Sequence, residues 1–162
     1  MNSEAVIVPA KEEHLEEAAK IAVYAWTGIH ESYAERLGEE MHEELFDGWE
    51  MAKVNSVKAG LMSGRGYVAL VDGKVAGFIS YRVEKEKGLG EILANAVSGE
   101  FRGMGIGHKM YEFVLAKMRE EGMKYATVST GLDDGHAPAR RAYEKMGFSK
   151  NLPSVKYYME LE

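Results

Sequence analysis

The sequence predicts an α+β domain in which a mostly antiparallel sheet is flanked by helices. Three strand-like runs follow one another without an intervening helix, at 67–71, 74–83 and 91–97. Consecutive strands joined by short turns pair antiparallel. Amphipathic helical patterns stand before and after this block of strands. Runs of strands bordered by helices, rather than a strict alternation of the two, are typical of the α+β class.

Length and composition indicate one globular domain covering 1–162. The chain of 162 residues is 46% hydrophobic and 28% charged, which is enough for one full core and too little for two comfortable ones. The formal net charge of −6 argues against a nucleic-acid partner, because phosphate backbones bind basic surfaces. It suits an amine substrate better than an anionic one.

The sequence contains no cysteine, which excludes disulfides, thiolate metal sites and an acyl intermediate on a cysteine. The histidines show no metal-ligand spacing, so we expect no metal. The first nine residues have neither a basic region nor a long apolar one. No apolar run approaches the roughly 18 residues of a membrane helix. We therefore expect a soluble cytoplasmic protein that has no membrane partner.

The first part of the chain predicts a strand followed by helices. Ala5–Val8 is strand-like and is stopped by Pro9. Apolar residues then recur at i, i+3, i+4 and i+7, which predicts a helix over 12–37. Gly28 inside this helix could mark a bend or a break. A second helical pattern runs over 45–61.

Turn signals separate the later elements. Asp72-Gly73 lies between two strand-like runs and is a strong hairpin signal. The helix after the third of these strands ends near Gly122, which suits the position after a helix end. The remaining predicted elements are a strand at 125–130, a helix from about Pro138 to Gly147, and a closing strand at 155–161.

One short stretch, 100–109, joins the strand ending at Val97 to the next helix. Its glycines at 103, 105 and 107 remove the side chains that would keep a ligand away from the backbone N–H groups. Those groups lie at the positive end of the helix, where an anion such as a pyrophosphate is stabilised. The stretch therefore predicts a site for a phosphorylated cofactor.

Two other phosphate-binding loops fit this stretch poorly. A P-loop requires Gly-x-x-x-x-Gly-Lys-Ser/Thr, which the sequence lacks. A dinucleotide-binding loop requires Gly-x-Gly-x-x-Gly after the first strand of a parallel βαβ unit. Here the three glycines alternate with other residues, and antiparallel hairpins precede them.

Two motifs lie on these predicted elements. The first is Arg102-Gly103-Met104-Gly105-Ile106-Gly107. The second is His136-Ala137-Pro138-Ala139-Arg140-Arg141-Ala142-Tyr143-Glu144-Lys145-Met146-Gly147-Phe148. In this order they resemble two motifs of the GCN5-related N-acetyltransferase (GNAT) superfamily. These are the acetyl-CoA loop Gln/Arg-x-x-Gly-x-Gly/Ala and the later motif Asn-x-x-Ala-x-x-x-Tyr-x-x-x-Gly-Phe. The likeness covers essentially the whole chain. It departs at His136, where the family has asparagine.

The resemblance implies the acyl-CoA N-acyltransferase fold, with a mixed sheet of six or seven strands and about four flanking helices. It implies direct transfer of acetyl from acetyl-CoA to a primary amine of a small molecule or peptide, in a ternary complex. Homodimers are frequent in the family, so a homodimer is a further expectation. Two alternatives stay open: an acyl-CoA-binding regulatory or scaffold domain without turnover, and an O-acyltransferase or longer-chain acyltransferase.

The resemblance also assigns cofactor binding to one set of residues. The side chain of Val97 could equally be a core residue, and that of Arg102 an exposed surface arginine. At position 136 an imidazole could still donate a hydrogen bond in place of the family's asparagine. The full set is Ala96, Val97, Arg102, Gly103, Met104, Gly105, Ile106, Gly107, His108, His136 and Ala139.

For catalysis, Tyr143 occupies the family's position for the acid that protonates the departing thiolate, although it could also be a core tyrosine. Glu91, eleven residues before Arg102, matches the general-base offset of the histone-acetyltransferase branch, although it could simply face solvent. The base could also be a chain of waters. Asn95 could bind substrate or satisfy a buried backbone group.

In this fold the acceptor usually lies between the first helices and the C-terminal strands. The aromatic and imidazole side chains there are candidates to line it, and each could also be a core or surface residue. We expect the lining to include Trp26, His30, Tyr33 and Trp49, with a negative rim of Glu39, Glu40, Glu43 and Glu44.

Overall fold

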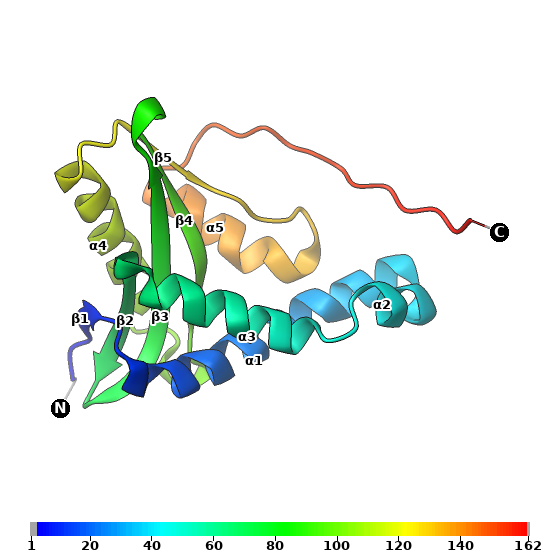
Figure 1. Ribbon diagram of the computed structural model, residues 1–162, viewed down its shortest axis with the longest axis horizontal. Coiled ribbons are helices and arrows are strands. Elements are labelled where there is room, and N and C mark those ends of the chain that lie inside the picture. The colour runs from blue at the N-terminus through cyan, green and yellow to red at the C-terminus, as the bar shows by residue number, and fades with distance from the viewer. Residues whose placement is uncertain (1–2, 162) are drawn as a thin grey trace.

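The computed structural model describes residues 3–161 and has a five-stranded sheet with helices on both faces (Figure 1). The strands lie across the sheet in the order of the sequence. Neighbours pair antiparallel, except that β4 and β5 are parallel. The strands are β1 (Val6–Pro9), β2 (Gly66–Val71), β3 (Lys74–Glu84), β4 (Leu89–Val97) and β5 (Tyr125–Val128).

Five α-helices and several short helical turns complete the described chain. The α-helices are α1 (Leu15–Leu37), α2 (Glu39–Leu45), α3 (Trp49–Gly60), α4 (Ile106–Glu120) and α5 (Ala137–Met146). A π-turn covers Leu61–Arg65, and 3₁₀ turns cover Glu12–His14, Lys85–Lys87, Gly99–Phe101 and Asp134–His136. None of the helices in 3–161 is long and apolar enough to cross a membrane.

The core has two halves, one on each face of the sheet. On one face, α1 and α3 pack against strand residues that include Val68 and Phe78. On the other face, α4 and α5 cover a cluster that includes Ile79 and Met110. Figure 1 shows these two helical layers on opposite sides of the strands. The alternation of the strand side chains, which places neighbours on opposite faces, supplies both halves.

The structure confirms the α+β class and most predicted elements. The helix expected over 12–37 is a 3₁₀ turn followed by α1, which continues through Gly28 without a break. The Asp72-Gly73 hairpin is present, with φ of 49° and 78°, because a tight turn between twisted strands needs positive φ at both positions. The predicted start of the helix over 45–61 is wrong. Helices α2 and α3 are separate, and α3 begins after Gly48, whose φ is 72°.

The predicted sheet of six or seven strands is the main error. The sheet has five strands, and 155–161, expected to be a closing strand, forms none. The segment is extended and exposed (Figure 1). Alternating side chains give a segment the potential to be a strand, but a strand exists only where a neighbour pairs its backbone groups.

An ion pair and a hydrogen bond join three parts of the chain that are distant in sequence, at Arg65, Tyr81 and Glu121. The Arg65 guanidinium donates to both oxygens of Glu121 at 2.8–3.1 Å, and the Tyr81 hydroxyl donates to Glu121 Oε1 at 2.5 Å. These hydrogen bonds, from Arg65 first and then from Tyr81, lower the pKa of Glu121 from 4.5 to about 2. The charged carboxylate therefore stabilises the fold.

Replacing Glu121 by glutamine is expected to lower the free energy of unfolding by about 1–3 kcal/mol at neutral pH, because hydrogen bonds to a charged group are lost. The folded-state pKa is below the unfolded value, so this stabilisation is complete above pH 4.5 and is lost as the pH falls through about 2. Urea unfolding at pH 7 and near pH 3 should therefore show a smaller difference between the two proteins in acid.

The matched control is Glu120→Gln, which removes the neighbouring carboxylate from an exposed pair with Lys117 at 3.0 Å. Exposed pairs contribute little, so this variant should stay within about 0.5 kcal/mol of wild type. Equal losses in the two variants would contradict the role given to Glu121.

Candidate active site

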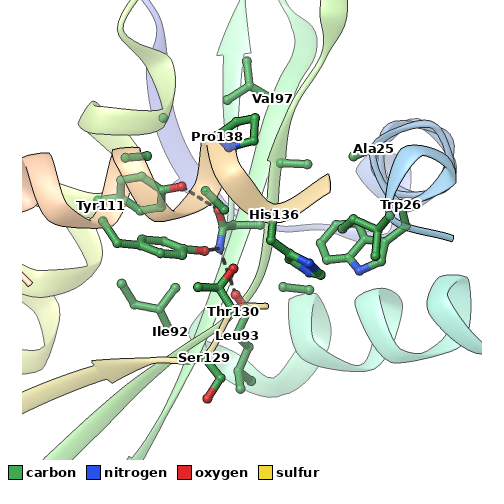
Figure 2. A pocket seen from close by; sticks show the side chains of 18 of the residues that line it. Ala25, Trp26, Ile92, Leu93, Val97, Tyr111, Ser129, Thr130, His136 and Pro138 are labelled. Atoms are coloured by element: carbon green, nitrogen blue, oxygen red, sulfur yellow. Dashed lines mark hydrogen bonds between the residues drawn. The ribbon is translucent and has the colours of Figure 1, made fainter. Parts of the chain in front are cut away.

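A cleft of about 780 Å³ opens where β4 and β5 separate. Only Leu89–Ile92 of β4 pairs with β5, so the remainder of β4 up to Val97 has no partner on that side. Helices α1 and α3 form one wall, and the start of α4 together with α5 forms the other. Figure 2 shows the cleft, with Trp26 on one side and Tyr111 on the other.

The N-terminus of α4 lies at one end of this cleft. The loop before it turns at Gly103 (φ 76°) and Gly105 (φ 72°), both in the region that side-chain-bearing residues rarely adopt. The first α-helical bond closes from Lys109 N to Gly105 O at 3.1 Å, so the N–H groups of residues 106–108 have no acceptor within the helix. This is the geometry of an anion site at a helix N-terminus.

Several side chains predicted to bind the cofactor lie around this end. Arg102, Gly107, His108 and Ala139 line the cleft, whereas the side chain of Ile106 is buried in the core at 2% exposure. The predicted residues Gly103, Met104 and Gly105 form the turn itself and are exposed. Backbone N–H groups and a guanidinium are suited to a pyrophosphate, so the residues present fit the predicted coenzyme.

The open edge of β4 supplies a further backbone donor. Ser98 N donates to Ala76 O of β3 at 2.8 Å, and adjacent residues of a strand direct their N–H groups to opposite edges. The Val97 N–H therefore points away from β3 toward the cleft, which Ala96 and Val97 both line. The Val97 side chain packs against the core meanwhile, so the two predicted roles of this residue are compatible.

A hydrogen-bonded group of two tyrosines and one asparagine lies in the middle of the cleft. Asn95 Nδ2 donates to the Tyr143 hydroxyl at 3.2 Å and to Leu93 O at 3.0 Å. The Tyr111 hydroxyl donates to Asn95 Oδ1 at 2.8 Å. Asn95 thereby joins β4 to α4 and α5. Because the Tyr143 oxygen accepts the Asn95 hydrogen bond, its own hydrogen is available for a different acceptor.

Burial raises the pKa of Tyr143, although the hydrogen bonds of Asn95 and Tyr111 act in the opposite direction. Burial also raises the pKa of Tyr111. Tyr143 is 8% exposed and therefore holds its proton at neutral pH. Tyr111 was missed by the sequence analysis, because an aromatic residue next to the apolar stripe of a helix is most simply read as core.

Glu91 lines the same cleft but is already paired. Its Oε2 lies 2.5 Å from the Arg82 guanidinium on the neighbouring strand, and its side chain is 25% exposed. The guanidinium therefore occupies one oxygen of the carboxylate. Glu91 is thus present at the cleft, though its carboxylate has a competing partner.

His136 forms a second pair in the cleft wall, with Asp133. His136 Nδ1 lies 2.7 Å from Asp133 Oδ1, and the two side chains are 16% and 10% exposed. Burial raises the pKa of Asp133, but the hydrogen bond and charge of His136 outweigh it and the net shift is downward. Arg140 Nη1 donates to the carbonyls of Gly131 and Asp133 at 2.6 and 2.8 Å and holds the loop in place.

Asp133 was not identified from the sequence. It lies in a loop of glycine and aspartate residues that reads as solvated, yet it is only 9% exposed. Its second oxygen, Oδ2, is buried without a hydrogen-bond partner among the described residues. Figure 2 shows His136 pointing from the start of α5 toward the Trp26 side of the cleft.

The residues predicted to line the acceptor side divide into two groups. Trp26 lines the cleft, with Lys53 Nζ 4.2 Å from the centre of its ring. His30 and Tyr33 are outside the lining. His30 stacks on Trp49 at 4.0 Å between ring centres, and Tyr33 contacts the same cluster.

The His30 imidazole also lies 3.0 Å from His42 of α2, from Nδ1 to Nε2. Burial lowers the pKa of His30, and the proximity of His42 lowers it further. The pair therefore ties α1 to α2. The predicted negative rim lies on α2, where all four glutamates are exposed: Glu39, Glu40, Glu43 and Glu44. Across 3–161, no group of three or more histidines and carboxylates could hold a metal.

Known proteins resemble this chain in sequence and in fold. Human N-acetylaspartate synthetase is 33% identical over 97 residues, covering 57% of this chain and 30% of that protein. The chain spans about a third of the length of the curated relatives it matches.

Two solved structures share the fold over most of their length. One is PaiA N-acetyltransferase from Thermoplasma acidophilum in complex with coenzyme A, with a TM-score of 0.64 and 18% identity over 90% of each chain. The other is aminoglycoside N-acetyltransferase AAC(6')-Iy in complex with CoA, with a TM-score of 0.64 and 16% identity over 99% of this chain and 98% of that one.

The family comparison agrees with the two motifs. The model of the Acetyltransferase (GNAT) family matches residues 23–148, a range that includes the glycine loop, the open edge of β4 and Tyr143. This match covers most of the chain and confirms the resemblance noted from the sequence. The chain belongs to the GNAT acetyltransferase family.

Proposed function

We propose that the protein transfers an acetyl group from acetyl-CoA directly to a primary amine of a small molecule or a peptide, within a ternary complex. One observation carries the proposal: the Val97 N–H, the first N–H groups of α4 and the Tyr143 hydroxyl all face a single cleft. Direct transfer needs a donor for the acyl oxygen, an anion site and an acid within reach of one another.

Bound acetyl-CoA supplies the activated acetyl thioester. The N–H groups of residues 106–108 and the Arg102 guanidinium are suited to hold its pyrophosphate. The Val97 N–H is suited to donate a hydrogen bond to the acyl oxygen, and such a preoriented donor is worth most where charge develops during reaction. These are backbone groups of the fold, apart from Arg102, and they need no rearrangement of side chains.

Tyr143 is the proposed acid. Burial keeps its phenol protonated, and Asn95 donates a hydrogen bond to the phenol oxygen from one side. The hydroxyl hydrogen is then free to be given to the departing sulfur. Asn95 and Tyr111 act as positioning residues, because they contact Tyr143 or Asn95 and fix the direction of the phenol.

Two residues of the cleft are candidates for the base that takes a proton from the acceptor amine. Glu91 is the candidate from the sequence, but Arg82 holds its carboxylate. We infer that His136 is the stronger candidate. Asp133 engages its Nδ1, which leaves Nε2 to take a proton from the amine, directly or through water. The alternative role for His136 is the cofactor contact that the family resemblance assigns to position 136.

The proposed acceptor carries an amine, and the cleft does not by itself specify the other chemical groups of that molecule. Relatives are named for N-acetylaspartate and for aminoglycosides, which differ in charge. The cleft contains Lys53 beside Trp26, and burial lowers the pKa of that lysine. It also contains Glu91 with its Arg82 partner. An acceptor with both an amine and a carboxylate would complement Lys53, whereas a polyamine would not.

Release of CoA should therefore be measured with a panel of amino acids, peptides, polyamines and aminoglycosides. Turnover with at least one amine, and a matching acetylated product by mass spectrometry, is the expected result. Tight acetyl-CoA binding without turnover on any acceptor would favour the regulatory or scaffold alternative. Products acylated on oxygen, or faster turnover with longer acyl-CoAs, would favour the other alternative.

Replacing Tyr143 by phenylalanine is expected to lower kcat by roughly 10- to 10⁴-fold, the range for loss of a general acid. The variant keeps the aromatic packing, and Asn95 keeps its bond to Leu93 O. The control is Tyr24→Phe, on the exposed face of α1 at 68% exposure, which should leave kcat unchanged. An unaltered kcat in Tyr143→Phe would remove this assignment.

The base is tested by the pH dependence of kcat/KM in three variants. His136→Asn should abolish the acid limb of the profile, and Asp133→Asn should lower kcat/KM, because the carboxylate holds the imidazole in its orientation. Glu91→Gln should leave the profile in place. If instead Glu91→Gln removes the limb, Glu91 is the base. If His136→Asn changes only the KM for acetyl-CoA, His136 is a cofactor contact.

A further inference from the structure

Helix α2 is held to the rest of the domain by few contacts. It has no buried residue, whereas each of the other α-helices in 3–161 has at least one. Figure 1 shows α2 away from the strands, beside the ends of α1 and α3 that lie farthest from the sheet. It is bounded by Gly38 and Gly48, whose φ angles are 87° and 72°. Residues at element ends can absorb the backbone rotations of a hinge, and elements with few buried contacts open most easily.

The contacts that do hold α2 centre on one imidazole of α1. His30 is 9% exposed, and its Nδ1 lies 3.0 Å from Nε2 of His42 on α2. The His30 ring also lies 4.0 Å from that of Trp49 at the start of α3, and 5.5 Å from that of Phe46 just after α2. His42 stacks on Phe46 at 5.3 Å between ring centres. His30 thus joins α1 to α2 and to the segment that follows it.

The hydrogen bond between the two imidazoles limits how many protons the pair can carry. A neutral imidazole has one N–H and one acceptor nitrogen, so one of the two facing nitrogens donates and the other accepts. A first added proton goes to the outer nitrogen of the donating imidazole and leaves the hydrogen bond in place. A second added proton has only the accepting nitrogen left to it. It would place two N–H groups against each other and two positive charges side by side.

Charged groups on both neighbouring helices act on His30. Burial is the largest cause that lowers its pKa from 6.5, and His42 of α2 lowers it further. On α3, Glu50 raises the pKa and Lys53 lowers it. On α1 itself, Tyr33 lies 5.2 Å away between ring centres, and burial keeps its phenol protonated by raising its pKa. Since the docked state resists the proton, docking is fully favoured above pH 6.5 and is lost as the pH falls through the lowered pKa of His30.

This pair lies behind one wall of the cleft. Ile29, the residue before His30, lines the cleft. The loop that carries His136 packs closely on it, because a Cβ added to Gly135 would lie 3.0 Å from Ile29 Cα. The ring of Tyr33 lies 6.4 Å from that of His136. Release of α2 would therefore remove packing from the part of α1 that supports this loop.

We propose that the His30–His42 hydrogen bond is a pH-sensitive clasp, which holds α2 against α1 near neutral pH and releases it about Gly38 and Gly48 when both imidazoles are protonated. The helix is poised for this release because its remaining contacts are few. The proposal rests on the imidazole pair and the two glycines, and it is independent of the acetyl transfer.

Amide hydrogen exchange of α2 tests the clasp in wild type and in His42→Gln. The glutamine amide can either donate to or accept from His30 Nδ1, and it does not titrate. Comparing the two proteins at the same pH cancels the intrinsic pH dependence of exchange. Between pH 7 and pH 5, protection of amides 42–46 should fall about tenfold more in wild type than in the variant, as one proton is taken up. An equal fall in both proteins would overturn the proposal, as would a matching loss of protection in β3, which would indicate global unfolding.

The matched control is Glu43→Gln, which removes an exposed titratable group from the next position of α2. This variant should keep the pH dependence of wild type. If it becomes as insensitive to pH as His42→Gln, the carboxylates of α2 and not the imidazoles control the helix, and the proposal fails.

A third variant, His42→Ala, removes the clasp at every pH. Its amides 42–46 should already exchange at pH 7 about as fast as those of wild type do at pH 5, relative to the intrinsic rates. Wild-type protection of α2 in His42→Ala at pH 7 would show that other contacts hold the helix, and it would contradict the clasp.

Discussion

The separation of β4 from β5 is the constraint on which the site depends. The two strands pair over four residues at one end, Leu89–Ile92 with Tyr125–Val128, and then diverge. A pleated strand without a neighbour has free N–H and C=O groups, and these must bond to something. Here they line the cleft. The N-terminus of α4 lies at the end of this open edge, because the chain leaves β4 at Val97 and enters the helix at Ile106.

Asn95 then connects this backbone feature to the tyrosine side chains of the cleft. It is on the divergent part of β4, yet it bonds to tyrosines of α4 and α5, Tyr111 and Tyr143. The three groups come from different elements, and each buries a hydroxyl or amide that would be costly if unpaired. The position of Tyr143 relative to the strand is therefore fixed by the same hydrogen bonds that make its burial tolerable.

Local signals in the sequence were sufficient to predict much of the fold and part of the site. Asp72-Gly73 and the alternating glycines at 103 and 105 report on φ angles that few residues adopt, so these turns could be predicted from the sequence. Tyr111 and Asp133 could not. Their significance comes from partners that only folding brings together: Asn95 lies sixteen residues before Tyr111, and the loop of Asp133 is buried although its composition is that of a surface loop. The tail was misjudged for a related reason, since an alternating pattern does not specify which edge the segment will meet.

The left-handed glycines and the open strand edge also bear on how far such a sequence can diverge. A coenzyme held mainly by backbone groups makes few demands on side chains, because any residue with suitable φ and ψ presents the same N–H. The two fold neighbours in complex with coenzyme A share only 16–18% of its residues. A site built from main-chain geometry therefore depends on few side chains, and its strictest demands fall on the two glycines whose φ is positive, Gly103 and Gly105.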